Sequence, residues 1–123
     1  MAQIAKERMA AYRATAQRQW QAEQRALQQR RQRAWHIARQ ASNLLRERFS
    51  ANRVVVFGSL VDEGLFHSRS DVDLGVWGLD ERIYYYAVAQ VLALAPDIAF
   101  DLVRVEQASP ALSAMIEQTG VDV

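Results

Sequence analysis

Two aspartates stand one residue apart at the start of an apolar run, where Asp71 and Asp73 flank the first residue of Val72–Trp77. On an extended strand, residues two positions apart leave the same face, so these two carboxylates lie close together. Neighbouring carboxylates repel each other unless a cation lies between them. Hard oxygen ligands suit Mg²⁺, which takes its remaining ligands from water and substrate phosphates. The spacing therefore predicts a magnesium site for phosphate chemistry.

A glycine-serine pair supplies a matching site for the phosphate. Gly58 and Ser59 follow the apolar run Arg53–Phe57, at the end of a predicted buried strand. A glycine lets the backbone approach an anion closely, the serine offers a hydroxyl, and the following turn directs N–H groups toward the anion. Taken alone, Gly58-Ser59 also fits a plain turn, and Asp71 fits a turn or cap. Together they predict a phosphate cradle beside the carboxylates.

A third carboxylate, Asp101, stands in the middle of the apolar run Ile98–Val105, where an unpaired buried charge would be costly. If this run forms a strand beside the one that carries the other two aspartates, the three acids converge on two metal ions. Such a pair of metals activates an attacking oxygen and stabilises a leaving pyrophosphate. The alternative is an ion pair of Asp101 with Arg53 or Arg104.

The elements that must position these residues follow from local patterns. Runs of β-branched and apolar residues predict strands, and a long stretch of Ala, Gln, Arg, Glu and Leu without Pro or Gly predicts a helix. Asp80 is a predicted N-cap, and Ser109-Pro110 opens the last helix. We expect an α/β (α+β) fold with a small mixed sheet of about three strands flanked by helices. The predicted helices cover residues 3–49, 81–95 and 111–119, and the predicted strands cover residues 53–57, 72–77 and 98–105.

Charge divides the chain into two parts. Residues 1–50 carry 11 Lys/Arg against 3 Asp/Glu, whereas residues 51–123 carry 4 Lys/Arg against 11 Asp/Glu. The basic part is also the long predicted helix, which is too thinly apolar before its last turns to pack on a sheet along its whole length. We therefore predict an extended basic helical arm, residues 1–33, followed by one compact domain, residues 34–123.

The arm has three interpretations. Trp20, Leu27, Ala34 and Ala41 fall at heptad spacing, which predicts pairing with a second copy or with helices of a partner protein. A solvated helix face without a partner is the plainer alternative. We do not expect direct nucleic-acid binding, because the cations are mixed with Gln and form no dense patch.

Composition excludes several classes. The chain has no cysteine, so disulfides, thiolate metal sites and cysteine nucleophiles are absent. No apolar stretch approaches the roughly 20 residues that a membrane span needs. The first residues lack the apolar core of a secretory signal. We expect a cytoplasmic protein that binds no membrane.

At the residues discussed above, the chain resembles the minimal nucleotidyltransferases of the DNA polymerase β-like superfamily, over roughly residues 34–123. The resemblance implies a nucleotidyltransferase-like fold and a role as the antitoxin of a two-gene module whose toxin is a HEPN-domain ribonuclease. It also implies transfer of AMP from Mg-ATP to a tyrosine of that toxin. The motifs that carry it are FGS at residues 57–59, SDVDL at 70–74 and the FDLV segment at 100–103.

The same resemblance assigns roles to individual residues. It places Gly58, Ser59 and Ser70 at the nucleotide. It makes Asp71, Asp73 and Asp101 the ligands of two Mg²⁺ ions, with Asp101 also helping to deprotonate the incoming hydroxyl.

One departure opens an alternative function. After Gly-Ser, relatives often carry a basic residue, whereas Asp62 and Glu63 stand at that place here. Acids beside a triphosphate weaken its binding, so the alternative is a non-catalytic antitoxin that inhibits its toxin by direct binding through the N-terminal arm.

Several further residues are weaker candidates. His67 and Arg69 could touch phosphate or base, or simply lie in a surface loop. Three successive tyrosines, residues 84–86, cannot share one helix face, so at least one is expected to be exposed. His36 has no companion at ligand spacing, and we interpret it as structural.

Overall fold

The computed structural model describes residues 2–123. These residues divide into two compact units, one ending at Arg30 and the other covering residues 31–123. The predicted boundary after residue 33 stays a prediction. In chain order the helices and strands are α1 (Ala2–Phe49), β1 (Arg53–Phe57), β2 (Val72–Trp77), α2 (Tyr84–Leu92), β3 (Phe100–Arg104), α3 (Pro110–Thr119) and β4 (Val121–Asp122).

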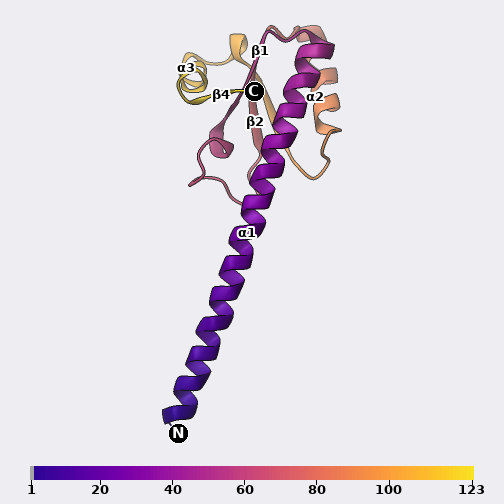
Figure 1. Cartoon of the computed structure of the whole chain (residues 1–123). Coiled ribbons are helices and arrows are strands. Elements are labelled where there is room, and N and C mark those ends of the chain that lie inside the picture. The colour runs from indigo at the N-terminus through magenta and orange to yellow at the C-terminus, as the bar shows by residue number, and fades with distance from the viewer. Residues whose placement is uncertain (1) are drawn as a thin grey trace. The chain divides into compact units, whose positions relative to one another are not determined.

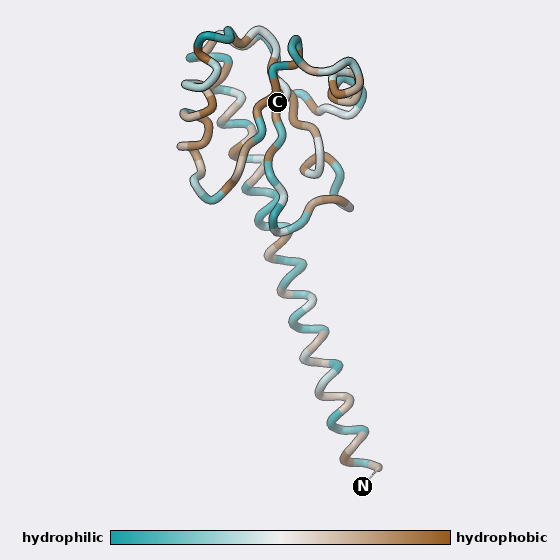
Figure 2. Tube along the Cα trace, turned by 180° about the vertical axis from the view of Figure 1, so that it is seen from behind, coloured by the Kyte–Doolittle hydropathy of each residue, from teal (hydrophilic) through white to brown (hydrophobic). Residues whose placement is uncertain are grey.

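The first unit consists of helix. Its composition, rich in Ala, Gln and Arg and free of Gly and Pro, favours this conformation throughout. Large apolar side chains stand exposed along it, among them Met9, Tyr12 and Trp20. Figure 2 shows teal and pale brown segments alternating along this part of the trace, without a continuous hydrophobic band. Among residues 2–123, no helix combines the length and apolar character of a membrane span.

The second unit is built on one mixed sheet with strand order β3-β2-β1-β4 (Figure 1). β1 runs antiparallel to β2 and to β4. β2 and β3 run parallel because α2 crosses between them, as a parallel connection requires. The sheet is therefore an antiparallel pair extended on one edge by a parallel strand and on the other by the short β4.

Helices cover both faces of this sheet. The last turns of α1 bury Ala34, Ile37, Ala38, Ala41 and Leu45, a spacing that places one apolar stripe on the sheet. Figure 1 shows this part of α1 and α2 on one side of the strands and α3 on the other. Side chains that alternate along β1 fill both layers, so all but the first residue of that strand are buried.

The core under α3 is a small apolar cluster. Val55 and Phe57 of β1 pack with Ile116 of α3 and with Val105, and all four side chains are buried. Gly75 of β2 lies in the same layer, where an added Cβ would press against Ile116 and Val55. This contact explains why β2 carries a glycine at the centre of the sheet.

Most predicted elements are confirmed, and the differences have local causes. β1 and β2 have the predicted bounds, and Ser109 caps α3 by accepting a hydrogen bond from Leu112 N at 3.2 Å. The second predicted helix begins instead with a 3₁₀ turn, Glu81–Ile83, capped by Asp80. The third strand is shorter than predicted. The expectation of three strands missed β4, because two residues are too few to show a period.

Candidate active site

The parallel register of β2 and β3 brings two of the predicted carboxylates side by side. Asp73 is paired with Asp101. Directly paired residues of neighbouring strands project from the same face, here the α3 face, because Gly75 two residues after Asp73 meets α3. Asp71 precedes the buried first residue of β2 and is exposed. The predicted meeting of acids from two neighbouring strands therefore has a structural basis.

Burial and neighbouring charges both act on the carboxyl of Asp73. Burial, then the charge of Asp101 and then that of Asp71, together raise the pKa of the Asp73 carboxyl to about 6. Within residues 2–123, none of the three carboxylates forms a salt bridge or accepts a side-chain hydrogen bond. The paired carboxylates of Asp73 and Asp101, and Asp71 near them in the chain, therefore receive no cation from the described residues.

Gly58 forms the other wall of this site. Phe57, the last residue of β1, is paired with Asp73. At Gly58 the chain therefore leaves the strand right beside the Asp73 carboxylate. Its φ of 77° is a left-handed conformation that side chains disfavour, and an added Cβ would collide with Asp73 Oδ2. The glycine of the Gly-Ser motif is thus required by both conformation and space. The 3₁₀ turn that follows, Gly58–Leu60, is anchored by its fully buried leucine.

The two serines of the site have different surroundings. Ser59 is half-buried, and its hydroxyl has no hydrogen-bond partner within the described chain. Ser70 is buried, and its Oγ accepts a hydrogen bond from His67 N at 2.8 Å, which closes the loop before Asp71. In the same loop His67 Nδ1 accepts from Arg69 N at 3.1 Å. Ser70 and His67 therefore order the loop that leads to the carboxylates, and the nucleotide role predicted for Ser70 stays a prediction.

The predicted burial of Asp101 is wrong, because the structure leaves this residue exposed. The reason is that β3 lies at the edge of the sheet, so an apolar strand pattern there does not mean enclosure on every side. The alternative ion pairs are absent as well: Arg53 binds Asp122 and Glu117, and Arg104 donates to the Leu79 carbonyl. The Asp101 carboxylate is left open to solvent.

One of the three successive tyrosines contacts the strand that carries Asp101. Tyr84 at the start of α2 donates its hydroxyl to the Leu102 carbonyl of β3, next to Asp101. Burial, and then the Asp101 charge, raises the pKa of Tyr84. Tyr85 and Tyr86 are exposed, which confirms that the three tyrosines do not share one buried face. The sequence pattern gave no indication of the Tyr84 bond, because its acceptor is a backbone atom.

The donor set fits a hard divalent cation. Carboxylate oxygens are the ligands that Mg²⁺ prefers, and three unneutralised carboxylates are stabilised by a cation among them. Within residues 2–123, no three acidic or imidazole side chains lie close enough together to hold a metal ion as they stand. Asp73 and Asp101, which the strand register pairs, are the carboxylates that would hold Mg²⁺. The predicted participation of Asp71 stays a prediction.

The raised pKa of Asp73 predicts a pH-dependent stability. Because the folded protein holds this proton more tightly than the unfolded chain does, its contribution is fully present below about pH 4 and is lost as pH rises through about 6. At about pH 8 we expect Asp73→Asn to raise the unfolding free energy by about 1 kcal/mol, after allowance for partial exposure. Thermal unfolding of both proteins measures this, and the difference should shrink toward about pH 4.

The control for this measurement is Mg²⁺. Added Mg²⁺ should raise the melting temperature of the wild-type protein at about pH 8 and leave that of Asp73→Asn nearly unchanged. An Asp73→Asn protein that is less stable than wild type at this pH would contradict the assigned repulsion.

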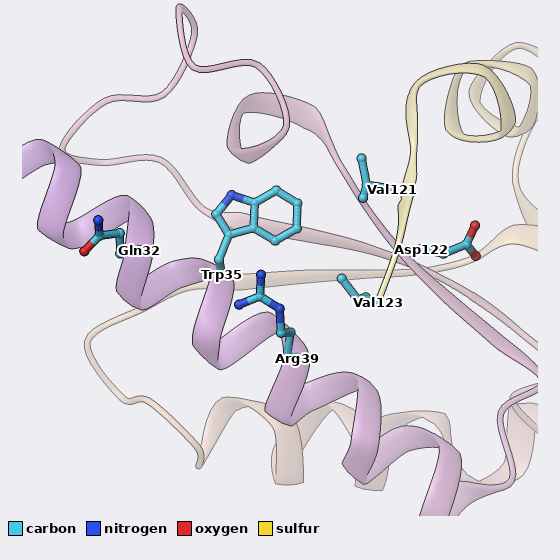
Figure 3. A pocket seen from close by; sticks show the side chains of 6 residues that line it. All are labelled: Gln32, Trp35, Arg39, Val121, Asp122 and Val123. Carbon is cyan, nitrogen blue, oxygen red and sulfur yellow. The ribbon is translucent and has the colours of Figure 1, made fainter.

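A pocket of about 500 Å³ opens at another place, beside β4. Figure 3 shows Trp35 and Arg39 of α1 facing Val121 and Val123, whereas the Asp122 carboxylate points away. That carboxylate is held by Arg53 Nε at 2.8 Å. None of the predicted site residues lines this pocket, and no group of acids converges in it. The predicted carboxylates Asp73 and Asp101 lie elsewhere, on β2 and β3.

A known family matches the part of the chain that carries the predicted site residues. The sequence profile of the polymerase beta nucleotidyltransferase family matches residues 39–123, which include all six predicted site residues. A sequence comparison with curated proteins finds no match.

Solved structures share the fold. A crystal structure of a mutant MntA–HpeT toxin–antitoxin covers 69% of this chain and 70% of its own, with a TM-score of 0.57 and 22% identity. A crystal structure of a toxin–antitoxin with AMP-PNP covers 65% and 66%, with a TM-score of 0.55 and 27% identity. A structure assigned as a minimal nucleotidyltransferase covers 80% and 94%, with a TM-score of 0.53 and 24% identity.

Proposed function

The chain belongs to the polymerase beta nucleotidyltransferase family, and on that premise we propose that it transfers AMP from ATP to a tyrosine hydroxyl of a HEPN-domain ribonuclease toxin. By this reaction it acts as the antitoxin that neutralises the toxin. The observation that carries the proposal is the pairing of Asp73 with Asp101 beside the left-handed turn at Gly58. That arrangement sets a pair of carboxylates beside a turn that offers backbone and a serine hydroxyl to a ligand.

The residues take the following roles in the proposed reaction. The Gly58 backbone and the Ser59 hydroxyl hold the triphosphate, and Asp71, Asp73 and Asp101 hold two Mg²⁺ ions. Bound Mg²⁺ supplies charge stabilisation for the phosphates and for the leaving pyrophosphate. The acceptor oxygen forms a bond to the α-phosphorus, the bond to pyrophosphate breaks, and the hydroxyl proton passes to Asp101. Because Asp101 is exposed, an acceptor carried by another protein can reach it.

The structural neighbours support the partner and the nucleotide. Two of the similar structures are toxin–antitoxin assemblies, and one of these contains AMP-PNP, an analogue of ATP. The mutant assembly carries two aspartate-to-glutamate changes two positions apart, which is the spacing of Asp71 and Asp73. Toxin neutralisation and ATP use are therefore the activities that best fit this chain.

The direct test uses the protein encoded by the adjacent reading frame as acceptor. After incubation with Mg-ATP, intact-mass spectrometry should show that protein heavier by one or more AMP units, and peptide mapping should place them on tyrosine. Omitting Mg²⁺ or adding a chelator should abolish the mass change. A stable complex in which the acceptor never gains AMP would contradict the proposal.

A second candidate is inhibition by contact alone, and the two acids after the Gly-Ser corner favour it. Asp62 and Glu63 are exposed there and repel a triphosphate. Co-expression with the toxin separates the two functions when Asp71 and Asp73 are both replaced by asparagine. Loss of protection with the complex intact indicates catalysis, whereas full protection indicates contact inhibition.

The exposed aromatic residues of the arm are the proposed contact with the toxin. Tyr12 and Trp20 are 79% and 60% exposed, and aromatic side chains dominate the energy of most protein interfaces. We expect Tyr12→Glu combined with Trp20→Glu to weaken the complex by at least about 10-fold, measured by calorimetry. The matched control, Gln3→Glu with Gln19→Glu, adds the same charge without removing an aromatic ring. Equal affinities of the two double variants would contradict this contact.

A further inference from the structure

One arginine reaches the nucleotide corner from a distant part of the sequence. Arg31 of α1 donates from Nη2 to the carbonyl oxygen of Leu60 at 2.9 Å, across 29 positions of the chain. Leu60 is the last residue of the 3₁₀ turn that begins at Gly58, and its side chain is fully buried. The hydrogen bond therefore ties the end of the turn to α1 immediately after Ser59. It lies outside the family match, which begins at residue 39.

The charge of Arg31 has no counterion in the described chain. Arg33, two residues later, is paired with Asp97 at 3.0 Å, and Arg53 with Asp122 at 2.8 Å. Arg31 forms no such pair within residues 2–123, and its Nε is buried without a hydrogen-bond partner. A partly buried cation without a carboxylate is costly unless an anion binds near it.

The turn itself supplies no positive charge. From Gly58 to Phe66 the sequence contains no Lys, Arg or His, and it contains Asp62 and Glu63. A triphosphate carries several negative charges and binds where positive charge and donors face it. In this neighbourhood Arg31 is the cation that the structure joins to the turn.

From these three observations we infer that Arg31 positions the Gly58–Leu60 turn and supplies the positive charge that favours a nucleoside triphosphate there. This inference rests on the proposed nucleotidyl transfer, because it names a residue that prepares the same site. The hydrogen bond holds the carbonyl end of the turn whose Gly58 backbone and Ser59 hydroxyl are proposed to bind the phosphates, and the guanidinium offsets the charge of the two acids that follow. Arg31 thus acts from α1 on a site built from the sheet.

The experiment compares three substitutions in the full-length protein. Arg31→Met removes both the donor and the charge, Arg31→Lys keeps both on a flexible stem, and Arg33→Met is the matched control on the same helix. Calorimetry with a non-hydrolysable ATP analogue and Mg²⁺ should show binding about 10- to 100-fold weaker for Arg31→Met. Arg31→Lys should restore binding to within about 3-fold of wild type, and Arg33→Met should change it by less than about 2-fold.

A second measurement needs no nucleotide and separates the two levels of the proposal. Amide hydrogen exchange of residues 58–66 should be faster in Arg31→Met than in wild type or in Arg33→Met, at equal melting temperature. Unchanged exchange in Arg31→Met overturns the positioning role, and unchanged nucleotide affinity overturns the charge role. If the wild-type protein itself binds no nucleotide, the proposed transfer fails and the charge role fails with it. The exchange result then still decides whether Arg31 holds the turn.

Discussion

Replacing Asp73 by asparagine is expected to lower AMP transfer by at least about 1,000-fold, because a bound metal lowers the activation barrier by several kcal/mol. Asp73 is the half-buried member of the carboxylate group, and it lies between Asp101 on β3 and Gly58 at the end of β1. The substitution therefore removes the carboxylate that lies next to both Asp101 and Gly58. Initial rates of AMP incorporation into the acceptor protein measure the effect.

Unfolding cannot account for this loss, since Asp73→Asn is expected to be more stable than wild type near neutral pH. The matched control is Glu81→Gln, which removes one exposed carboxylate beyond the opposite end of β2. It should retain the wild-type rate. If Asp73→Asn transferred AMP at a rate similar to that of Glu81→Gln, the proposed role of Asp73 in the reaction would be contradicted.

Replacing Gly58 by alanine is expected to damage both the fold and the site. A non-glycine residue in the left-handed region costs about 1–2 kcal/mol, so the unfolding free energy should fall by that amount. The new Cβ also collides with Asp73 Oδ2 and displaces that carboxylate. Misplacing a catalytic group by about 1 Å lowers the rate by about 100-fold, and we expect a loss of that order. Denaturant unfolding and transfer assays measure the two effects separately.

Gly64→Ala provides the control for this substitution. Gly64 lies in the same connection between β1 and β2, but an added Cβ there meets its nearest atom, Asp62 Oδ1, at an ordinary 3.4 Å. Its stability should change by no more than about 0.5 kcal/mol. If Gly58→Ala behaved like Gly64→Ala, the close approach of the turn to Asp73 would not matter for function.

Most helices and strands could be predicted from the local sequence. The bounds of β1 and β2 were predicted correctly because β-branched runs end at glycine or charged residues there. The N-cap of α3 at Ser109 was also evident, because a Ser-Pro pair before apolar residues is a local signal. The end of β3 and the start of α2 were less accurate, since 3₁₀ turns flank both and share residue preferences with helices.

The site divides in the same way. The types and spacing of Asp71 and Asp73, and the Gly-Ser pair before them, were by themselves enough to predict phosphate chemistry with a metal, because these features depend on strand periodicity and residue chemistry alone. Only the tertiary structure decided that Asp101 is paired with Asp73 and stands exposed on an edge strand. Only the tertiary structure brought Arg31 to the Leu60 carbonyl. Strand order and backbone acceptors depend on long-range packing, which no local pattern of residues records.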